Sequence, residues 1–251
     1  MKTRASLSCL AVAFATTVLS PAPTAAEAPS VDAILAHHVT ALGGQAAIEK
    51  IKSRVVIGTV TLPGMADSGW ELQQKAPNQQ LSIVDIPTVG KMRDGFDGKV
   101  AWSDSPFGGL REKTGDELAK TTRDNEFYRD LHFKTLYPGL AVVGTEKDGD
   151  QEVAVLESKP GAGVERFYFN LKTGLLARQV SEFDSPAGRV KVNSRLSDYR
   201  AVEGVQFPHQ LNLNVASPGQ PEMEVTIKVK DVSVNVPLDD ARFAKPTKPG
   251  A

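Results

Sequence analysis

The chain has 251 residues, of which 41% are hydrophobic, and its 29 Lys and Arg against 30 Asp and Glu give a formal net charge of −1. This balance argues against a nucleic-acid partner, because phosphate binding needs a basic excess or a clustered basic face. The single cysteine, Cys9, lies in an apolar N-terminal run. The rest of the chain therefore has no thiol for a disulfide, a nucleophile or a thiolate metal site.

The N-terminal residues have the pattern of a secretory signal. Lys2 and Arg4 precede an apolar run over residues 7–19, and a segment rich in Pro and Ala follows it. The run is shorter than the about 20 residues that a membrane-spanning helix needs. We expect residues 1–26 to be a cleaved signal peptide, with cleavage after Ala28 as the alternative. Residues 27–251 are then expected to form a single exported, periplasmic domain.

Two short helices are predicted at the start of this domain. Ser30 is placed to cap a helix over residues 31–42, which Gly43-Gly44 would end. A second helix is predicted over residues 45–51. Hydrophobic residues near helical spacing give the first helix one apolar stripe.

From Arg54 onward the hydrophobic period changes to two, which is typical of half-buried antiparallel strands. The alternation is clear over residues 211–215 and 225–229. Tight hairpin turns are predicted at three dipeptides, Asp97-Gly98, Asp148-Gly149 and Thr173-Gly174. Counting strand runs between turn signals predicts about 11 or 12 strands.

One helical segment interrupts the strands. Asp116 can cap a helix over residues 117–131, and Pro138 lies beyond its end. A final helical turn is predicted after Asp239-Asp240, where one aspartate can serve as the cap. The fold class is therefore α+β, a large antiparallel sheet with a few short helices. If the sheet curls, helices that cover it only partly leave a concave apolar trough, which is a default ligand site.

No short motif of known mechanism identifies an enzyme in this sequence. His37 and His38 are neighbours on a predicted helix and point about 100° apart, so we expect one half-buried and one exposed side chain rather than a shared metal site. His132 and His209 have no partner that the sequence assigns. We predict no catalytic residue, no metal and no cofactor; a hydrolase using scattered histidines and aspartates is the third hypothesis.

Side chains on the predicted strands are the candidate ligand contacts. Trp70 and Trp102 lie on strands, and Phe107 lies in a glycine-rich segment that could cover a pocket, although strand tryptophans are more often core residues. The candidate lining of the trough is Trp70, Leu72, Leu81, Ile83, Trp102 and Phe107.

Three stretches of the sequence together resemble a known family. They are residues 31–62, residues 71–102 and the ending over residues 235–243. They are similar to the outer-membrane lipoprotein-sorting proteins of the LolA/LolB-like type, in particular a poorly characterised bacterial branch, over about residues 31–246. The resemblance implies an open, strongly curved antiparallel half-barrel whose helices close an apolar cavity that receives lipoprotein acyl chains.

The leading hypothesis is a non-catalytic periplasmic binding protein that holds a lipid or a lipoprotein acyl chain and carries it through the cell envelope. The alternative is an envelope protein-interaction module of the same fold, in which the apolar face is an ordinary core and exposed loops dock a protein. Peripheral contact with a membrane is compatible with both.

Overall fold

The computed structural model describes residues 29–185 and 188–248. The predicted signal peptide, with Cys9 and the cleavage alternatives at Ala26 and Ala28, lies outside these residues. Within them, no helix is both long enough and apolar enough to cross a membrane.

The strands of the described residues form one antiparallel sheet of thirteen strands. In space the order is β6-β5-β4-β3-β2-β1-β13-β12-β11-β10-β9-β8-β7, so the first and the last strands of the chain pair at the centre. The predicted α+β class is confirmed, with one or two strands more than expected. The strands are β1 (Ser53–Thr61), β2 (Ser68–Lys75), β3 (Gln79–Ile86), β4 (Gly90–Phe96), β5 (Ala101–Ser105), β6 (Gly109–Glu112), β7 (Ala141–Asp148), β8 (Gln151–Ser158), β9 (Val164–Asn170), β10 (Leu176–Ser185), β11 (Gly188–Val202), β12 (Val205–Ala216) and β13 (Met223–Val234).

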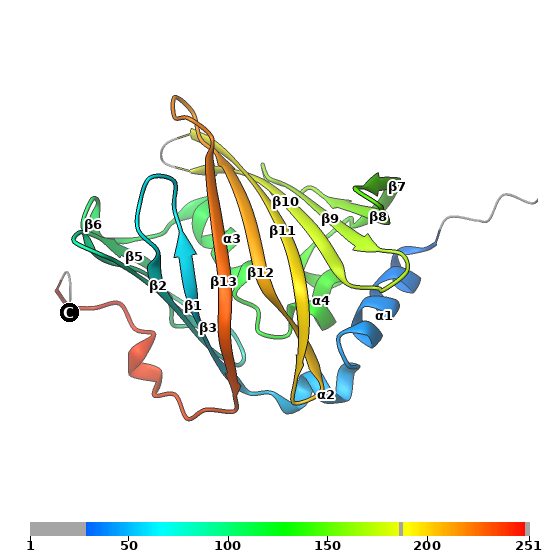
Figure 1. The fold of residues 1–251 in the computed structure, drawn as a ribbon, viewed down its shortest axis with the longest axis horizontal. Helices are drawn as coiled ribbons and strands as arrows, with labels where there is room; N and C mark the ends of the chain where they lie inside the picture. Colours follow the sequence, from blue (N-terminus) through cyan, green and yellow to red (C-terminus); the bar gives the residue numbers. More distant parts are fainter. Residues whose placement is uncertain (1–28, 186–187, 249–251) are drawn as a thin grey trace, which may run out of the picture.

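Helix α3 (Gly115–Asp124) shows how strongly the sheet curves. It contacts both β5 and β10, which lie eight positions apart in the strand order. A flat sheet with about 4.8 Å per strand would separate them by about 38 Å, whereas a ten-residue helix is only about 15 Å long. The sheet therefore curls around α3 as an open half-barrel. Figure 1 shows α3 and α4 (Arg129–Leu136) behind the central strands.

The two N-terminal helices are confirmed as α1 (Val31–Ala41) and α2 (Gln45–Lys50). Ser30 is the N-cap, because its hydroxyl accepts a hydrogen bond from the Ala33 N–H at 3.2 Å. Gly43 ends α1 at φ 118°, a backbone conformation that glycine adopts without strain. A Cβ at Gly43 would also overlap the carbonyl of Gly204, so the helix end packs directly against the turn between β11 and β12.

The single helix predicted over residues 117–131 is wrong, because the segment forms two helices, α3 and α4. Thr114 occupies the N-cap position of α3, and Asp116 lies in its first turn instead. The break follows from the position of Phe127, whose N–H donates to the carbonyl of Pro77 at 2.9 Å and whose side chain is buried. A continuous helix would use that N–H for its own carbonyl ladder. A tertiary contact therefore ends the helix.

Turn and cap predictions elsewhere are confirmed. Asp97-Gly98 connects β4 to β5, Asp148-Gly149 lies at the β7–β8 turn, and Thr173-Gly174 connects β9 to β10. Asp239 caps the final 3-10 turn η1 (Asp240–Arg242), since its carboxylate accepts the Ala241 N–H at 3.0 Å.

The main core lies between the helices and the concave face of the sheet. One cluster joins α1 and α4 to β8 and β9 around Phe133, Phe167 and Phe169. A second joins α1, α2 and the α3–α4 connection to β1, β12 and β13 around Val56 and Phe127. Two smaller clusters lie on the convex face. The helices thus cover the concave face over β8 and β9 and over one end of β1, β12 and β13.

Candidate functional site

The structure distributes the six predicted lining residues over two faces of the sheet and a loop. Trp70 and Leu72 are half-buried on the concave face, where they pack against the cluster that contains Val56. Phe107 lies between β5 and β6 and is 72% exposed. The other three, Leu81, Ile83 and Trp102, lie on the convex face. One pocket therefore cannot contain all six.

The convex group is covered by the C-terminal segment, residues 235–248. Phe243 is fully buried against Leu81 and Trp102, and the Trp102 indole N–H donates to the Phe243 carbonyl at 2.9 Å. Gly95 provides the space for this contact, because a Cβ there would overlap the Trp102 ring. Ile83 packs at the edge of the same cluster, beside a groove of about 470 Å³. The protein's own chain therefore covers part of the surface beside Trp102, and Leu81, Ile83 and Trp102 together line the groove that remains.

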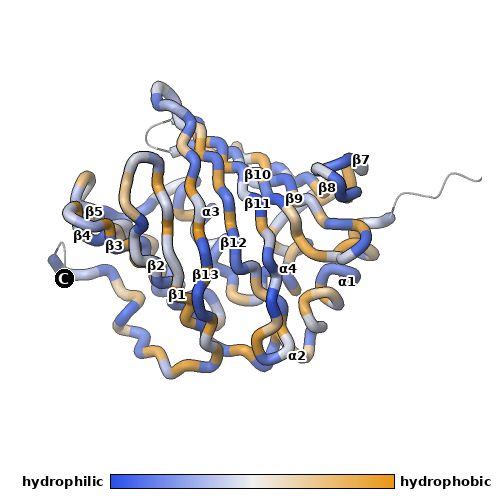
Figure 2. Tube along the Cα trace, in the orientation of Figure 1, coloured by the Kyte–Doolittle hydropathy of each residue, from blue (hydrophilic) through white to orange (hydrophobic). Residues whose placement is uncertain are grey.

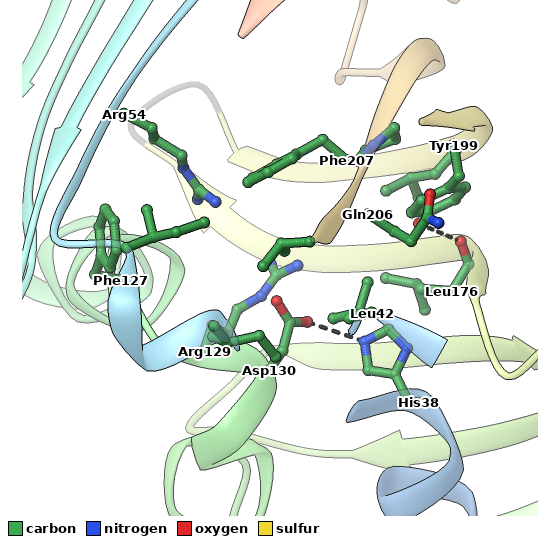
Figure 3. A pocket seen from close by; sticks show the side chains of 15 residues that line it. His38, Leu42, Arg54, Phe127, Arg129, Asp130, Leu176, Tyr199, Gln206 and Phe207 are labelled. Atoms are coloured by element: carbon green, nitrogen blue, oxygen red, sulfur yellow. Dashed lines mark hydrogen bonds and ion pairs between the residues drawn. The ribbon is translucent and has the colours of Figure 1, made fainter. Parts of the chain in front are cut away.

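A cavity of about 170 Å³ lies on the other side of the sheet, beneath the helices (Figure 3). It is lined by none of the six predicted residues. Its apolar wall comes from α1, α2, the α3–α4 connection and three strands, and its polar wall from six side chains. The apolar residues include Leu42, Ile48, Ile51, Phe127, Leu176, Leu196, Val205 and Phe207, and the six polar side chains are His38, Arg54, Arg129, Asp130, Tyr199 and Gln206.

The charged side chains reach the cavity from two elements, β1 and α4. Arg54 lies on β1 on the same face as Val56, two residues away, because side chains alternate along a strand. Arg129 and Asp130 begin α4, where a carboxylate is favoured by the helix dipole. Figure 3 shows the two arginines reaching the cavity from the sheet and from the helix.

His38 anchors Asp130 at one edge of this cavity. Its Nε2 lies 3.0 Å from Asp130 Oδ1, and its Nδ1 lies 3.0 Å from the carbonyl oxygen of Gly174. His38 is 1% exposed whereas His37 is exposed, so the pair divides as predicted but His38 is buried more completely. Both ring nitrogens of His38 are used within the fold.

Electrostatics differ sharply between Asp130 and Arg54, two of the three charged groups that line the cavity. Burial alone would raise the pKa of Asp130, but the hydrogen bond from His38 and the nearby positive charges outweigh it and lower that pKa to about 2. Burial lowers the pKa of Arg54 to about 10, and Arg129 adds to this lowering while Asp130 opposes it. Both groups are charged at neutral pH. The carboxylate is well stabilised, whereas the guanidinium is incompletely compensated.

Six half-buried side chains form a second apolar surface on the concave face, which we call the aliphatic band. It consists of Val192 on β11, Leu211, Leu213 and Val215 on β12, and Val225 and Ile227 on β13. Leu211 pairs with Ile227 and Ile227 pairs with Val60, so the band shares the face on which Val56 packs under the helices. Figure 2 shows hydrophobic and hydrophilic residues alternating along these strands. None of the six belongs to the four core clusters of the described residues.

Helix α3 crosses this side of the sheet and forms ion pairs with strands on both sides of it. Arg111 on β6 pairs with Glu117 at 2.6 Å, and Lys120 lies 3.4 Å from Glu165 on β9. No residue of α3 is fully buried. Polar contacts rather than apolar packing therefore hold α3 across the half-barrel.

The remaining histidines do not assemble into a site. His132 pairs with Glu126 at 3.1 Å on the surface, and the Nδ1 of buried His209 lies 2.9 Å from the Phe207 carbonyl oxygen. Among the residues that the structure describes, no group of three or more His, Cys, Asp or Glu side chains is placed to hold a metal ion.

Comparison with solved structures agrees with this architecture, whereas comparison of sequences finds no match. No protein-family model matches the sequence, and no curated protein sequence matches it. A LolA superfamily protein from Nitrosomonas europaea matches over 87% of this chain and 99% of its own, with 16% identity and a TM-score of 0.52. The chain has a LolA-like fold.

A second LolA-like structure leads to the same fold. It is described as a putative outer-membrane lipoprotein-sorting protein domain from Vibrio parahaemolyticus, and it matches over 77% of this chain and 90% of its own, with 14% identity and a TM-score of 0.53. At these identities the likeness concerns the fold alone. The resemblance predicted from the sequence is confirmed at that level.

Sequence reasoning missed the charged residues of the cavity. Arg54 lies on the same face of its strand as Val56 and Val60, because side chains alternate along a strand. A charged residue on an otherwise apolar face was a signal in the sequence that could have indicated a site. Because the opposite register carries Val55 and Ile57, the pattern did not reveal which face was concave. Asp130 and His38 are 92 residues apart, and only the fold brings them together.

Proposed function

We propose that this LolA-like protein is an exported periplasmic binding protein that holds an apolar ligand, a lipid or the acyl chain of a lipoprotein, on the concave face of its sheet. The observation that carries the proposal is the aliphatic band, whose side chains face the helices without joining any core cluster of the described residues. The role is non-catalytic. A leader over residues 1–26 and a single domain over residues 27–251 belong to the same proposal.

The energetics of burial support an acyl ligand. Each methylene that leaves water contributes about 0.8 kcal/mol, so a few methylenes against the band make a chain bind measurably. The band runs across three adjacent long strands, and paired residues keep its side chains next to one another, as with Leu213 and Val225. An extended chain could lie across them.

The fold neighbours support the same class of ligand. One of them is described as a putative outer-membrane lipoprotein-sorting protein domain. A carrier function brought to this chain on a shared fold is an analogy, since one fold hosts several functions. The band is therefore the feature to test.

The test is a fluorescence titration with an uncharged acyl probe, a dye-labelled monoacylglycerol, on two matched variants. Leu213→Gln places an amide in the band, and Ile57→Gln makes a similar change on the convex face, where Ile57 is 45% exposed. We expect Leu213→Gln to weaken binding about tenfold, since it removes apolar contact and leaves an amide to desolvate. Ile57→Gln should leave the dissociation constant unchanged.

Equal effects of the two variants would contradict the proposal. If the wild-type protein binds no acyl probe, the alternative of an envelope protein-interaction module takes its place. A partner retained from envelope extract in the absence of lipid would then be the supporting result.

A further inference from the structure

The cavity beneath the helices carries more positive than negative charge. Arg54 and Arg129 both line it, and Asp130 is the one carboxylate among its lining residues. That carboxylate already accepts the His38 contact at 3.0 Å. The ion pairs within the described part of the chain include neither arginine. Burial alone would lower the pKa of Arg129, but nearby negative groups, among them Asp130, Asp124 and Glu165, raise it. Arg54 is therefore the cation of the cavity that is short of an anionic partner.

Arg54 is the less compensated of the two arginines. Its Nε donates to the side-chain oxygen of Gln74, a neutral partner, and its guanidinium lies 5.1 Å from the Phe127 ring centroid and 5.7 Å from that of Phe207. Two aromatic faces and an amide stabilise this half-buried cation only in part. The low pKa of Arg54, about 10, has burial as its main cause.

An anionic group in the cavity would supply what the fold lacks. A guanidinium presents a planar fork of donors that binds a carboxylate or a phosphate with two parallel hydrogen bonds. The cavity volume of about 170 Å³ corresponds to about five or six waters at about 30 Å³ each, which leaves room for either group.

The cavity is continuous with the aliphatic band. Leu196 lines the cavity, and on the neighbouring strand it pairs with Leu211, the first residue of the band on β12. Leu211 in turn pairs with Ile227. A ligand whose charged end lies at Arg54 can therefore extend its apolar chain past Leu196 onto the band.

We infer that the cavity is an anion site for the head of an amphiphile, in which Arg54 binds the carboxylate or phosphate, Arg129 adds a second positive charge, and the apolar chain lies on the aliphatic band. This inference rests on the function proposed above, and it names the ligand class as anionic amphiphiles. The charge of the head, rather than the chain, is what the cavity selects.

Competition binding against the uncharged acyl probe tests this inference with four compounds. They are dodecanoate, dodecyl phosphate, 1-monododecanoylglycerol and inorganic phosphate. We expect the wild-type protein to bind both anionic amphiphiles at least about tenfold more tightly than the uncharged one, as charge-assisted hydrogen bonds to a half-buried arginine allow. Inorganic phosphate should compete weakly, because it lacks the chain.

Variants assign the preference to Arg54. Arg54→Gln should weaken binding of both anionic amphiphiles at least about tenfold, which brings the ratio between anionic and uncharged ligands to about one. Arg54→Lys should keep part of the preference, because it retains the charge without the fork. The control is Arg195→Gln, an arginine of the same sheet that pairs with Asp148 outside the cavity and should leave the ratio unchanged. Far-ultraviolet circular dichroism verifies that each variant folds.

Each of the other outcomes contradicts a different part of the proposal. Equal affinity of the wild-type protein for anionic and uncharged dodecyl ligands overturns the anion site and leaves the acyl-binding function standing. Inorganic phosphate that binds as tightly as dodecyl phosphate overturns the amphiphile and indicates a free-anion site. No binding by any acyl compound overturns the proposed function itself.

Discussion

The two faces of the sheet carry similar apolar side chains but use them differently. On the convex face, Leu81 and Trp102 are sealed by Phe243 from the C-terminal segment. On the concave face, the aliphatic band joins no core cluster of the described residues, and the adjacent cavity contains charged side chains. Burial of the apolar side chains on the convex face stabilises the fold. The charged side chains of the concave cavity contribute little to stability. The difference separates a structural contact from a candidate binding site.

The largest expected effect comes from breaking the convex contact. Phe243→Ala removes a fully buried ring and should lower the free energy of unfolding by about 3–5 kcal/mol, measured by urea denaturation. Trp102 should then become more exposed and its fluorescence should shift to longer wavelength, because the Phe243 ring that packs against it is gone.

The matched control for this variant is Phe107→Ala, since that side chain is 72% exposed and should change stability by no more than about 0.5 kcal/mol. Binding of the uncharged acyl probe should remain in Phe243→Ala as long as the protein folds. A selective loss of probe binding in the folded variant would mean that the convex face is the ligand site.

A smaller effect sharpens the comparison on the concave side. Asp130→Asn removes the carboxylate beside His38 and should cost about 1 kcal/mol at neutral pH, because the Asp130 side chain is 34% exposed and solvent screens it. The pKa of Asp130 in the folded protein, about 2, lies below its ordinary 3.8. Its contribution is thus fully present above about pH 4 and is lost as the pH falls through 2.

The measurement is the difference in unfolding free energy between wild type and Asp130→Asn from pH 6 to pH 2. This difference should shrink over the acidic part of that range. A difference that stays constant with pH would show that Asp130 is not stabilised by its charged neighbours.

Local signals in the sequence account for much of the fold. Ser30 and Asp239 cap the elements predicted for them, and alternation over residues 211–215 and 225–229 indicates strands that the structure contains. These features depend on neighbours within a few residues, so the sequence displays them directly. The broken helix was missed because its cause, the contact of Phe127 with Pro77, joins residues far apart in the chain.

The candidate site was less accessible to sequence reasoning. Trp102 and Leu81 have the composition of a ligand pocket, yet a segment about 140 residues later in the chain fills the space beside them. The cavity depends on Arg54, Arg129 and Asp130 converging from the sheet and α4. Periodicity indicates that two faces exist, but only tertiary structure decides which face is covered and by what.

The central claim is that the concave face, not the convex face, holds an acyl chain. Photo-crosslinking with an uncharged monoacylglycerol that carries a diazirine in its chain, followed by peptide mapping, tests it most directly. The expected adducts lie on residues 190–196, 211–216 and 223–229. Adducts confined to residues 81–102 and 235–248 would contradict the account.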